Sequence, residues 1–301
     1  MGYEEFKQKL SARLRYFYGD GTEVKIDIMK RNNGQEYEGL MVVPKSVESR
    51  CSIAPVIRLD AFYYAYRNGE MDFDGCIEKI CSEIRNSEPS DYMFRGGTQL
   101  LDWNSVKDNI YPILLSTREN SEQLEQLVSM PMLDLSVAYI IRCDVPEEYS
   151  GCIKISKNML ECYRVSRDEL HRQAVWNLEK DDYEFHDIEP IVRNMMQGIM
   201  EVKVFTKAPL SMYILTNSKL YGAAGILNKK MLREFARNRN YYILPSSLHE
   251  TIFVPDDGGC SKERLDEMVK EVNAELVEAE EILSDHSYYY DAKMEEIRMC
   301  A

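Results

Sequence analysis

The stretch from Met212 to Pro255 decides the fold class and reads MYILTNSKLYGAAGILNKKMLREFARNRNYYILPSSLHETIFVP. Its apolar runs are short and are bounded by polar or turn-forming residues, which is typical of strands. We predict strands at Met212–Asn217, Tyr221–Leu227, Tyr241–Leu244 and Thr251–Val254. Between them, Met231, Leu232 and Phe235 recur at helical spacing and predict a helix from about Asn228 to Asn238. Such alternation of short strands with a helix indicates a mixed fold.

The same alternation extends to both sides of this stretch. A hairpin is predicted around Asn32-Asn33-Gly34, because Asn and Gly tolerate the positive φ angles of tight turns. A helix is predicted over residues 165–179, because Ser166 and Glu169 have the spacing of a capping box. Further helices are predicted near residues 3–18, 61–67, 72–84, 120–128, 188–200 and from Ser261, and further strands near residues 24–28, 37–43, 53–59, 111–115 and 136–143.

These elements predict an α+β or mixed α/β fold, in which antiparallel or mixed sheets pack with amphipathic helices. At 301 residues the chain is long enough for one large domain or for two of ordinary size. We predict an N-terminal α+β region over residues 1–145 and a C-terminal α/β region over residues 146–301, with a single domain as the alternative.

The composition is that of a folded, soluble protein, with 45% hydrophobic and 29% charged residues. The longest apolar stretches, such as Val137–Ile141, are far shorter than the ~20 residues that a membrane span needs. The N-terminus has no continuous apolar core, so no secretory signal is expected. The 8 cysteines form no CxxC pair and are expected to be reduced thiols. These features predict a cytoplasmic protein that does not enter a membrane.

Charge and aromatic content bear on the partners that the chain can bind. With a net charge of −14 the protein repels phosphate backbones, so nucleic acid is disfavoured unless the predicted helix Lys229–Arg239 forms a basic patch. Tyrosine supplies apolar area with a polar tip, and the 20 tyrosines include the clusters Tyr63-Tyr64-Ala65-Tyr66 and Tyr288-Tyr289-Tyr290. We expect each cluster to expose at least one ring, and we predict a protein partner that binds a tyrosine-rich surface.

Ser246, Ser247, His249 and Glu250 are the candidate catalytic residues. A hydrolase needs a nucleophile, a base that accepts its proton and an acid that orients the base, and these residue types are present. Neighbours in an extended segment alternate faces, however, and no GxSxG elbow surrounds either serine. A distance of ~3 Å between the Ser247 Oγ and an imidazole nitrogen, at a pocket, would favour an enzyme. Hydroxyls bonded to the backbone would instead indicate a structural turn.

No metal site and no cofactor are predicted. Two histidines with nearby carboxylates could suit zinc. Such residues occur at His249, Glu250, Asp256, Asp257, Asp285 and His286. Nothing in the sequence brings the two groups together, and His-x-x-x-His spacing is absent. The run Gly222-Ala223-Ala224-Gly225 lacks the features of phosphate and dinucleotide loops, and its small residues favour close packing instead.

The stretch quoted above, continued by LDEMVKEVNAELVEAEEILSDHSYYYD at residues 265–291, carries a resemblance to a known family. Its most specific part is Leu244–Glu250, which follows the Gly222-Ala223-Ala224 turn. The chain resembles the uncharacterised family called domain of unknown function 5688, abundant in Gram-positive gut anaerobes, over nearly its whole length. The resemblance implies a bacterial, cytosolic setting and carries no established activity.

Two functional hypotheses follow. The leading one is a non-catalytic cytosolic protein that binds a protein partner or a peptide through a tyrosine-rich, acidic surface. The alternative is a hydrolase or another small-molecule enzyme that uses Ser247 and His249.

Overall fold

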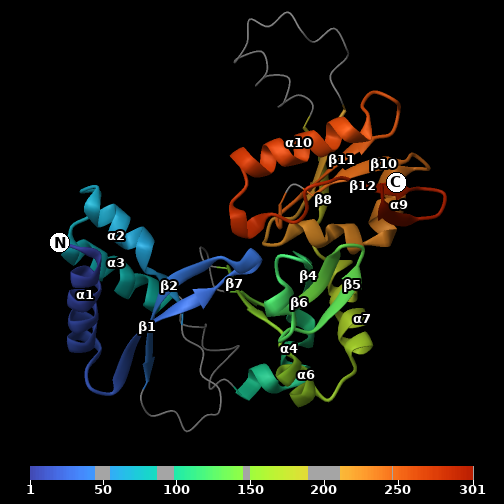
Figure 1. Cartoon of the computed structure of the whole chain (residues 1–301). Coiled ribbons are helices and arrows are strands. Elements are labelled where there is room, and N and C mark those ends of the chain that lie inside the picture. Colours follow the sequence, from blue (N-terminus) through green and yellow to red (C-terminus); the bar gives the residue numbers. More distant parts are fainter. Residues whose placement is uncertain (45–54, 87–97, 145–149, 189–210, 246, 301) are drawn as a thin grey trace, which may run out of the picture. The chain divides into compact units, whose positions relative to one another are not determined.

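The computed structural model describes residues 1–44, 55–86, 98–144, 150–188, 211–245 and 247–300 (Figure 1). These residues form helices and three sheets in which the paired strands run antiparallel, so the mixed α+β fold predicted from the sequence is confirmed. The chain divides into two compact units, Met1–Val106 with Arg142–Ile153 and Lys107–Ile141 with Lys154–Ala301. The division at residues 145 and 146 that the sequence suggests stays a prediction.

The first unit is built on a hairpin that contacts three helices. β1 (Thr22–Lys30) pairs with β2 (Glu36–Pro44), and the short β3 (Ile57–Arg58) pairs with the other side of β2. The turn η1 (Asn32–Gly34) holds Asn33 and Gly34 at φ angles of 56° and 67°, which confirms the predicted Asn-Gly turn. The helices are α1 (Tyr3–Tyr18), α2 (Leu59–Arg67) and α3 (Phe73–Asn86).

Apolar residues at helical spacing form the core of this unit. Phe6, Leu10 and Leu14 of α1 are fully buried, and they share one cluster with Ile80 and Ile84 of α3. Burying a side chain of this size stabilises a fold by about 1.5–3 kcal/mol. The cluster therefore fixes the helices of the first unit against its hairpin.

A four-stranded sheet has the order β4–β6–β5, and β7 also pairs with β6. Its strands are β4 (Ile110–Ser116), β5 (Ser129–Met132), β6 (Leu135–Asp144) and β7 (Ser150–Lys154). The short elements around it are η2 (Thr98–Leu101), α4 (Trp103–Val106), η3 (Lys107–Asn109), α5 (Ser121–Leu124) and α6 (Lys157–Tyr163). The helix α7 (Arg167–Leu178) contacts β4 and begins as predicted, because the Ser166 Oγ accepts a hydrogen bond from the Glu169 N–H at 3.1 Å.

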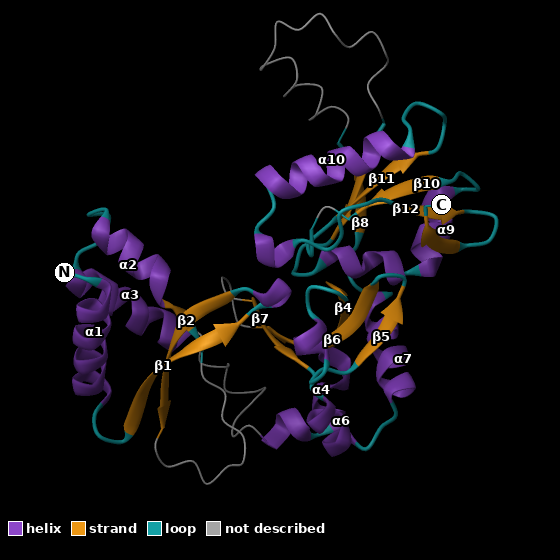
Figure 2. Cartoon of the chain, in the orientation of Figure 1, coloured by secondary structure: helices purple, strands orange, loops and turns teal. Residues whose placement is uncertain are grey.

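The six-stranded sheet has the order β13–β12–β10–β11–β9–β8 and carries helices on both faces. Its strands are β8 (Glu184–Asp187), β9 (Tyr213–Thr216), β10 (Tyr241–Leu244), β11 (Thr251–Pro255), β12 (Tyr288–Asp291) and β13 (Glu296–Met299). Because side chains alternate along β10, Leu244 packs with Val269 of α10 (Lys262–Glu275), whereas Tyr241 contacts Phe235 of α9 (Lys229–Ala236). Figure 2 shows α10 running along one side of this sheet.

Some predictions of element type were wrong. Tyr221–Leu227, predicted as a strand, forms the 3₁₀ helix η4 (Gly222–Leu227), because Tyr221 at φ 63° turns the chain away from the direction of β9. A short apolar run does not distinguish a strand from a buried helical turn. The helix predicted near residues 120–128 is limited to α5, since the Val128 N–H already bonds to the Ile155 carbonyl.

Other predictions fall at the edge of the described residues. The strand predicted near residues 53–59 is described only at its end, where it forms β3 and is followed by α2 from Leu59. Residues 189–200 of the helix predicted near residues 188–200 lie outside the described part of the chain. Within the described ranges, none of the helices is both long enough and apolar enough to span a membrane.

A tyrosine–histidine pair connects β6 to α7. Tyr139 is fully buried, and its hydroxyl lies 3.0 Å from the Nδ1 of His171. Burial lowers the pKa of His171 and raises the pKa of Tyr139. The Tyr139 hydroxyl therefore donates its hydrogen bond to a neutral imidazole.

This pair predicts a specific pH dependence of stability. Below about pH 6.5, the ordinary histidine pKa, the unfolded chain binds a proton more readily than the folded chain, so burying His171 lowers the free energy of unfolding as the pH falls. The His171→Asn variant keeps an acceptor near the position of Nδ1 but does not titrate. As the pH is lowered from about 7.5 to about 5, the free energy of unfolding of the variant should therefore rise relative to that of the wild type. Urea unfolding at both pH values measures this, and parallel pH dependences would contradict it.

Candidate functional site

The loop between β10 and β11 contains the candidate catalytic residues. Ser246 lies outside the described residues. Ser247 is buried, and its Oγ accepts a hydrogen bond from the backbone N–H of His249 at 3.0 Å. The Ser247 N–H in turn donates to the Glu250 carbonyl at 3.4 Å. The loop is thus closed by its own backbone and by a serine hydroxyl, as in a structural turn.

The His249 imidazole has a partner at each nitrogen. Its Nε2 lies 3.1 Å from the Glu281 Oε1, and its Nδ1 accepts a hydrogen bond from the Tyr221 N–H at 3.4 Å. An accepting Nδ1 carries no proton, so Nε2 is the protonated nitrogen and donates to Glu281. The Tyr221 ring also stacks on the imidazole, with the centroids 5.9 Å apart. Because neither nitrogen is directed at the Ser247 Oγ, this geometry supports a structural role for His249, and the hydrolase hypothesis stays a prediction.

Gly222 makes the close approach that joins this loop to η4. A Cβ on Gly222 would overlap the carbonyl oxygen of His249. The same oxygen accepts a hydrogen bond from the Thr216 Oγ1 at 3.1 Å, and the Leu248 carbonyl accepts one from the Ala223 N–H at 3.2 Å. The Gly222-Ala223-Ala224 turn and the Leu248–Glu250 segment are therefore two sides of one packing unit.

The histidines considered as metal ligands have separate surroundings. His249 pairs with Glu281, whereas His286 lies 3.0 Å from Asp285 and 3.6 Å from Asp134. Among the residues that the structure describes, no group of three or more Cys, His, Asp or Glu side chains could hold a metal ion.

The two tyrosine clusters differ in exposure. In β12, Tyr288 and Tyr290 are buried, and the half-buried Tyr289 donates a hydrogen bond to Asp256 at 2.7 Å. In α2, Tyr64 is 65% exposed. The α2 cluster therefore presents the ring that is available to a partner.

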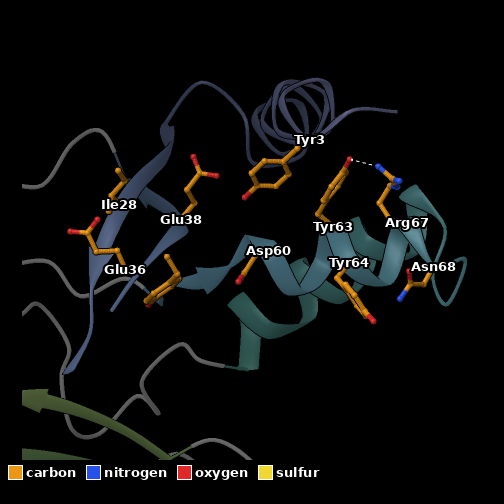
Figure 3. A pocket seen from close by; sticks show the side chains of 10 residues that line it. Tyr3, Ile28, Glu36, Glu38, Asp60, Tyr63, Tyr64, Arg67 and Asn68 are labelled. Atoms are coloured by element: carbon orange, nitrogen blue, oxygen red, sulfur yellow. Dashed lines mark hydrogen bonds between the residues drawn. The ribbon is translucent and has the colours of Figure 1, made fainter. Parts of the chain in front are cut away.

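A pocket of about 790 Å³ in the first unit is lined by residues of α1, the β1–β2 hairpin and α2 (Figure 3). This volume lies within the range of about 300–1,000 Å³ that is typical of ligand sites. The tyrosines in its lining are Tyr3, Tyr37, Tyr63 and Tyr64, and the charged residues are Glu36, Glu38, Asp60 and Arg67.

The course of the chain explains why the pocket forms here. β3 pairs with β2 at Gly39 and Leu40, and the chain then turns into α2 at Leu59. The first residues of β2, Glu36–Glu38, therefore line the pocket together with side chains of α2 instead of pairing with a continued β3. The Tyr3 and Tyr63 rings, 4.8 Å apart, bring α1 and α2 together at this place.

Glu38 holds the polar contacts of the pocket in place. The Lys7 Nζ lies 2.7 Å from the Glu38 Oε1, and the Tyr3 side chain lines the pocket beside the same carboxylate. Burial, the interaction with the Glu38 carboxylate and the nearby charge of Asp60 all raise the pKa of Tyr3. Its hydroxyl thus sits in a negative potential although Lys7 is close.

The other rings of the lining also contact cations. The guanidinium groups of Arg31 and Arg58 lie 4.8 Å and 5.8 Å from the ring centroid of Tyr37. Arg67 donates a hydrogen bond to the Tyr63 hydroxyl at 3.2 Å, and its guanidinium lies 5.9 Å from the Tyr63 ring centroid. The faces of these two rings therefore already carry guanidinium groups of the chain itself.

Sequence reasoning found Tyr63 and Tyr64 but missed the rest of this pocket. Tyr3, Glu38 and Arg67 are ordinary residues within their own segments, and only the fold of the first unit brings them together. One signal was available, because Arg67 follows Tyr63 by four residues and shares its face of the helix.

A comparison with protein families matches residues 3–292 to DUF5688, which is described as a family of unknown function. The chain belongs to DUF5688. The resemblance seen in the sequence is thereby confirmed, and the DUF5688 match includes both the pocket and the Gly222–His249 contact. No curated protein and no solved structure matches the chain.

The Gly222–His249 contact predicts that position 222 does not tolerate a side chain. Gly222→Ala places a methyl group against backbone atoms, which cannot move aside as a flexible side chain can. It should lower the free energy of unfolding by about 1–3 kcal/mol or more. Gly21→Ala is the matched control, because a Cβ there meets nothing within 4 Å. Urea unfolding of both variants measures the difference, and equal stabilities would contradict the contact.

Ser247 provides a second test in this loop. Ser247→Ala removes the acceptor of the His249 N–H and should lower the free energy of unfolding by about 1–3 kcal/mol. Urea unfolding measures this change, and p-nitrophenyl acetate hydrolysis is followed in parallel. Unchanged stability together with the loss of a measurable esterase activity would support the hydrolase hypothesis instead.

Proposed function

We propose that the protein is a non-catalytic binding protein that takes a peptide segment of a protein partner into the pocket of its first unit. The observation that carries the proposal is Tyr64, which is 65% exposed and lines the pocket. Among the described residues, its side chain makes no hydrogen bond and no ring contact. An aromatic ring that is held on a helix and has no partner of its own is a typical anchor for a bound peptide.

The protonation states of the pocket support binding rather than catalysis. The bond to Lys7 and the nearby Tyr3 hydroxyl lower the pKa of Glu38. At Asp60, burial raises the pKa of the carboxyl, but the bond to Arg58 and the other interactions of the carboxyl together outweigh burial, so the pKa is lowered there as well. Tyr3 is shifted the other way and stays protonated. A general acid or base works best with a pKa near the working pH, and these groups are moved away from it.

The edge of the hairpin favours a peptide as the ligand. Where β3 leaves the sheet at Arg58, the first residues of β2 continue along the pocket. An extended segment can pair with such a strand edge through main-chain hydrogen bonds, while its side chains enter neighbouring pockets. Tyrosine hydroxyls and rings then contact both the polar and the apolar parts of the segment.

The proposal includes a bacterial, cytoplasmic setting. The described cysteines, from Cys76 to Cys300, are free thiols, as expected in a reducing compartment. The acidity of the chain, with a net charge of −14, suits a protein or peptide partner better than nucleic acid.

The test compares two exposed tyrosines. Fluorescein-labelled random hexapeptides are screened for binding to the wild type by fluorescence anisotropy. The peptides that bind are then titrated with each variant. Tyr64→Ala should weaken their binding about 10-fold or more, as expected for an interface anchor. Tyr16→Ala is the control, because Tyr16 is 85% exposed on α1 and does not line this pocket. If the wild type retains no peptide, or if both variants bind equally well, the proposal is wrong.

A further inference from the structure

The charged side chains of the pocket are sorted along its length. Figure 3 shows Glu36 and Glu38 on the hairpin at one end and Arg67 at the other, with the Tyr3 and Tyr63 rings between them. Arg67 belongs to the last turn of α2. A ligand that spans the pocket would therefore meet opposite charges at its two ends.

Carboxylates line the hairpin end, and the guanidinium groups of Arg31 and Arg58 lie beside them on the Tyr37 ring. Glu36 is exposed and forms no ion pair with any residue that the structure describes. Glu38 is paired with Lys7, but the Lys7 side chain is only 13% exposed and does not line the pocket. Asp60 is held by Arg58 at 2.8 Å and keeps about half of its side chain exposed, at 49%. A ligand therefore meets three carboxylates here, one of them without a cation.

The helix end is positive. Arg67 is exposed and donates one hydrogen bond, to the Tyr63 hydroxyl. No carboxylate of the described residues pairs with its guanidinium. A guanidinium carries five N–H donors in a planar fork, so most of its donors remain available to a ligand carboxylate.

We infer, on the basis of the proposed function, that the pocket binds its peptide in one orientation, with a basic side chain at Glu36, Glu38 and Asp60 and a carboxylate at Arg67. The aliphatic stem of the basic residue packs on the exposed Tyr64 ring, and the carboxylates attract its charge. The reverse orientation places like charges together at both ends and is disfavoured for that reason.

The experiment uses two series of labelled peptides that differ only in order. Both are acetylated, amidated and labelled with fluorescein, and they carry Lys and Glu separated by one to five alanines, with Lys first in one series and Glu first in the other. At low salt, the best member of one series should bind the wild-type chain about 5- to 10-fold more tightly than its reversed counterpart. The preference should shrink as salt is added, because the charges are exposed.

Charge exchange within the protein provides the decisive variant. The double variant Glu36→Arg with Arg67→Glu should bind the reversed series more tightly and so invert the preference. Both residues are exposed, so the variant should fold, and its circular dichroism spectrum is compared with that of the wild type. Glu23→Arg on β1 is the matched control, because Glu23 is exposed and does not line the pocket, and it should keep the wild-type preference.

The outcomes separate this inference from the proposed function. If the wild type binds both series equally, or binds neither while it retains random hexapeptides in a Tyr64-dependent manner, the charge-sorted orientation is wrong and the proposed function stands. If the double variant keeps the wild-type preference, the orientation is also wrong. If no peptide binds in a Tyr64-dependent manner, both proposals are wrong.

Discussion

The backbone of Gly222 packs directly against the carbonyl oxygen of His249, in the loop between the central strands β10 and β11 of the six-stranded sheet. It brings η4 onto the loop between β10 and β11, while Thr216 at the end of β9 bonds to the same oxygen. The His249 ring is then held between the Tyr221 N–H and Glu281. Because the contact joins backbone to backbone, no side-chain rearrangement can make room for a Cβ at position 222.

In the first unit, the free edge of the β1–β2 hairpin is only partly paired with β3. β3 pairs with β2 over two positions before the chain becomes α2, and the pocket opens where that pairing stops. The tightly bonded loop beside His249 suits a structural role, whereas the pocket keeps exposed groups such as Tyr64 and Glu36. Exposed polar and aromatic groups on rigid elements are the common basis of recognition, which is why the binding hypothesis rests on this unit.

Part of the site was predictable from the sequence. Consecutive tyrosines cannot all face one side of a helix, so exposure within Tyr63–Tyr66 followed from helical geometry. The partners of these rings did not follow, because Tyr3 and Glu38 are far from α2 in the chain and reach it through long-range packing. The residue types near Ser247 suggested chemistry, but their roles depend on where each nitrogen and hydroxyl points, which spacing alone does not specify.

The sequence by itself determined the elements whose signals are local. The Asn-Gly turn of the hairpin, the Ser166 cap of α7 and the strand β10 follow from backbone preferences and from the period of apolar residues, which act over a few residues. Only the tertiary structure decided that Tyr221–Leu227 is a 3₁₀ helix and that His249 is bonded to Glu281. The physical reason is that an apolar run can be buried in more than one backbone conformation, and an imidazole can bond to more than one kind of partner. Which conformation and which partner occur depends on what the rest of the chain packs against them.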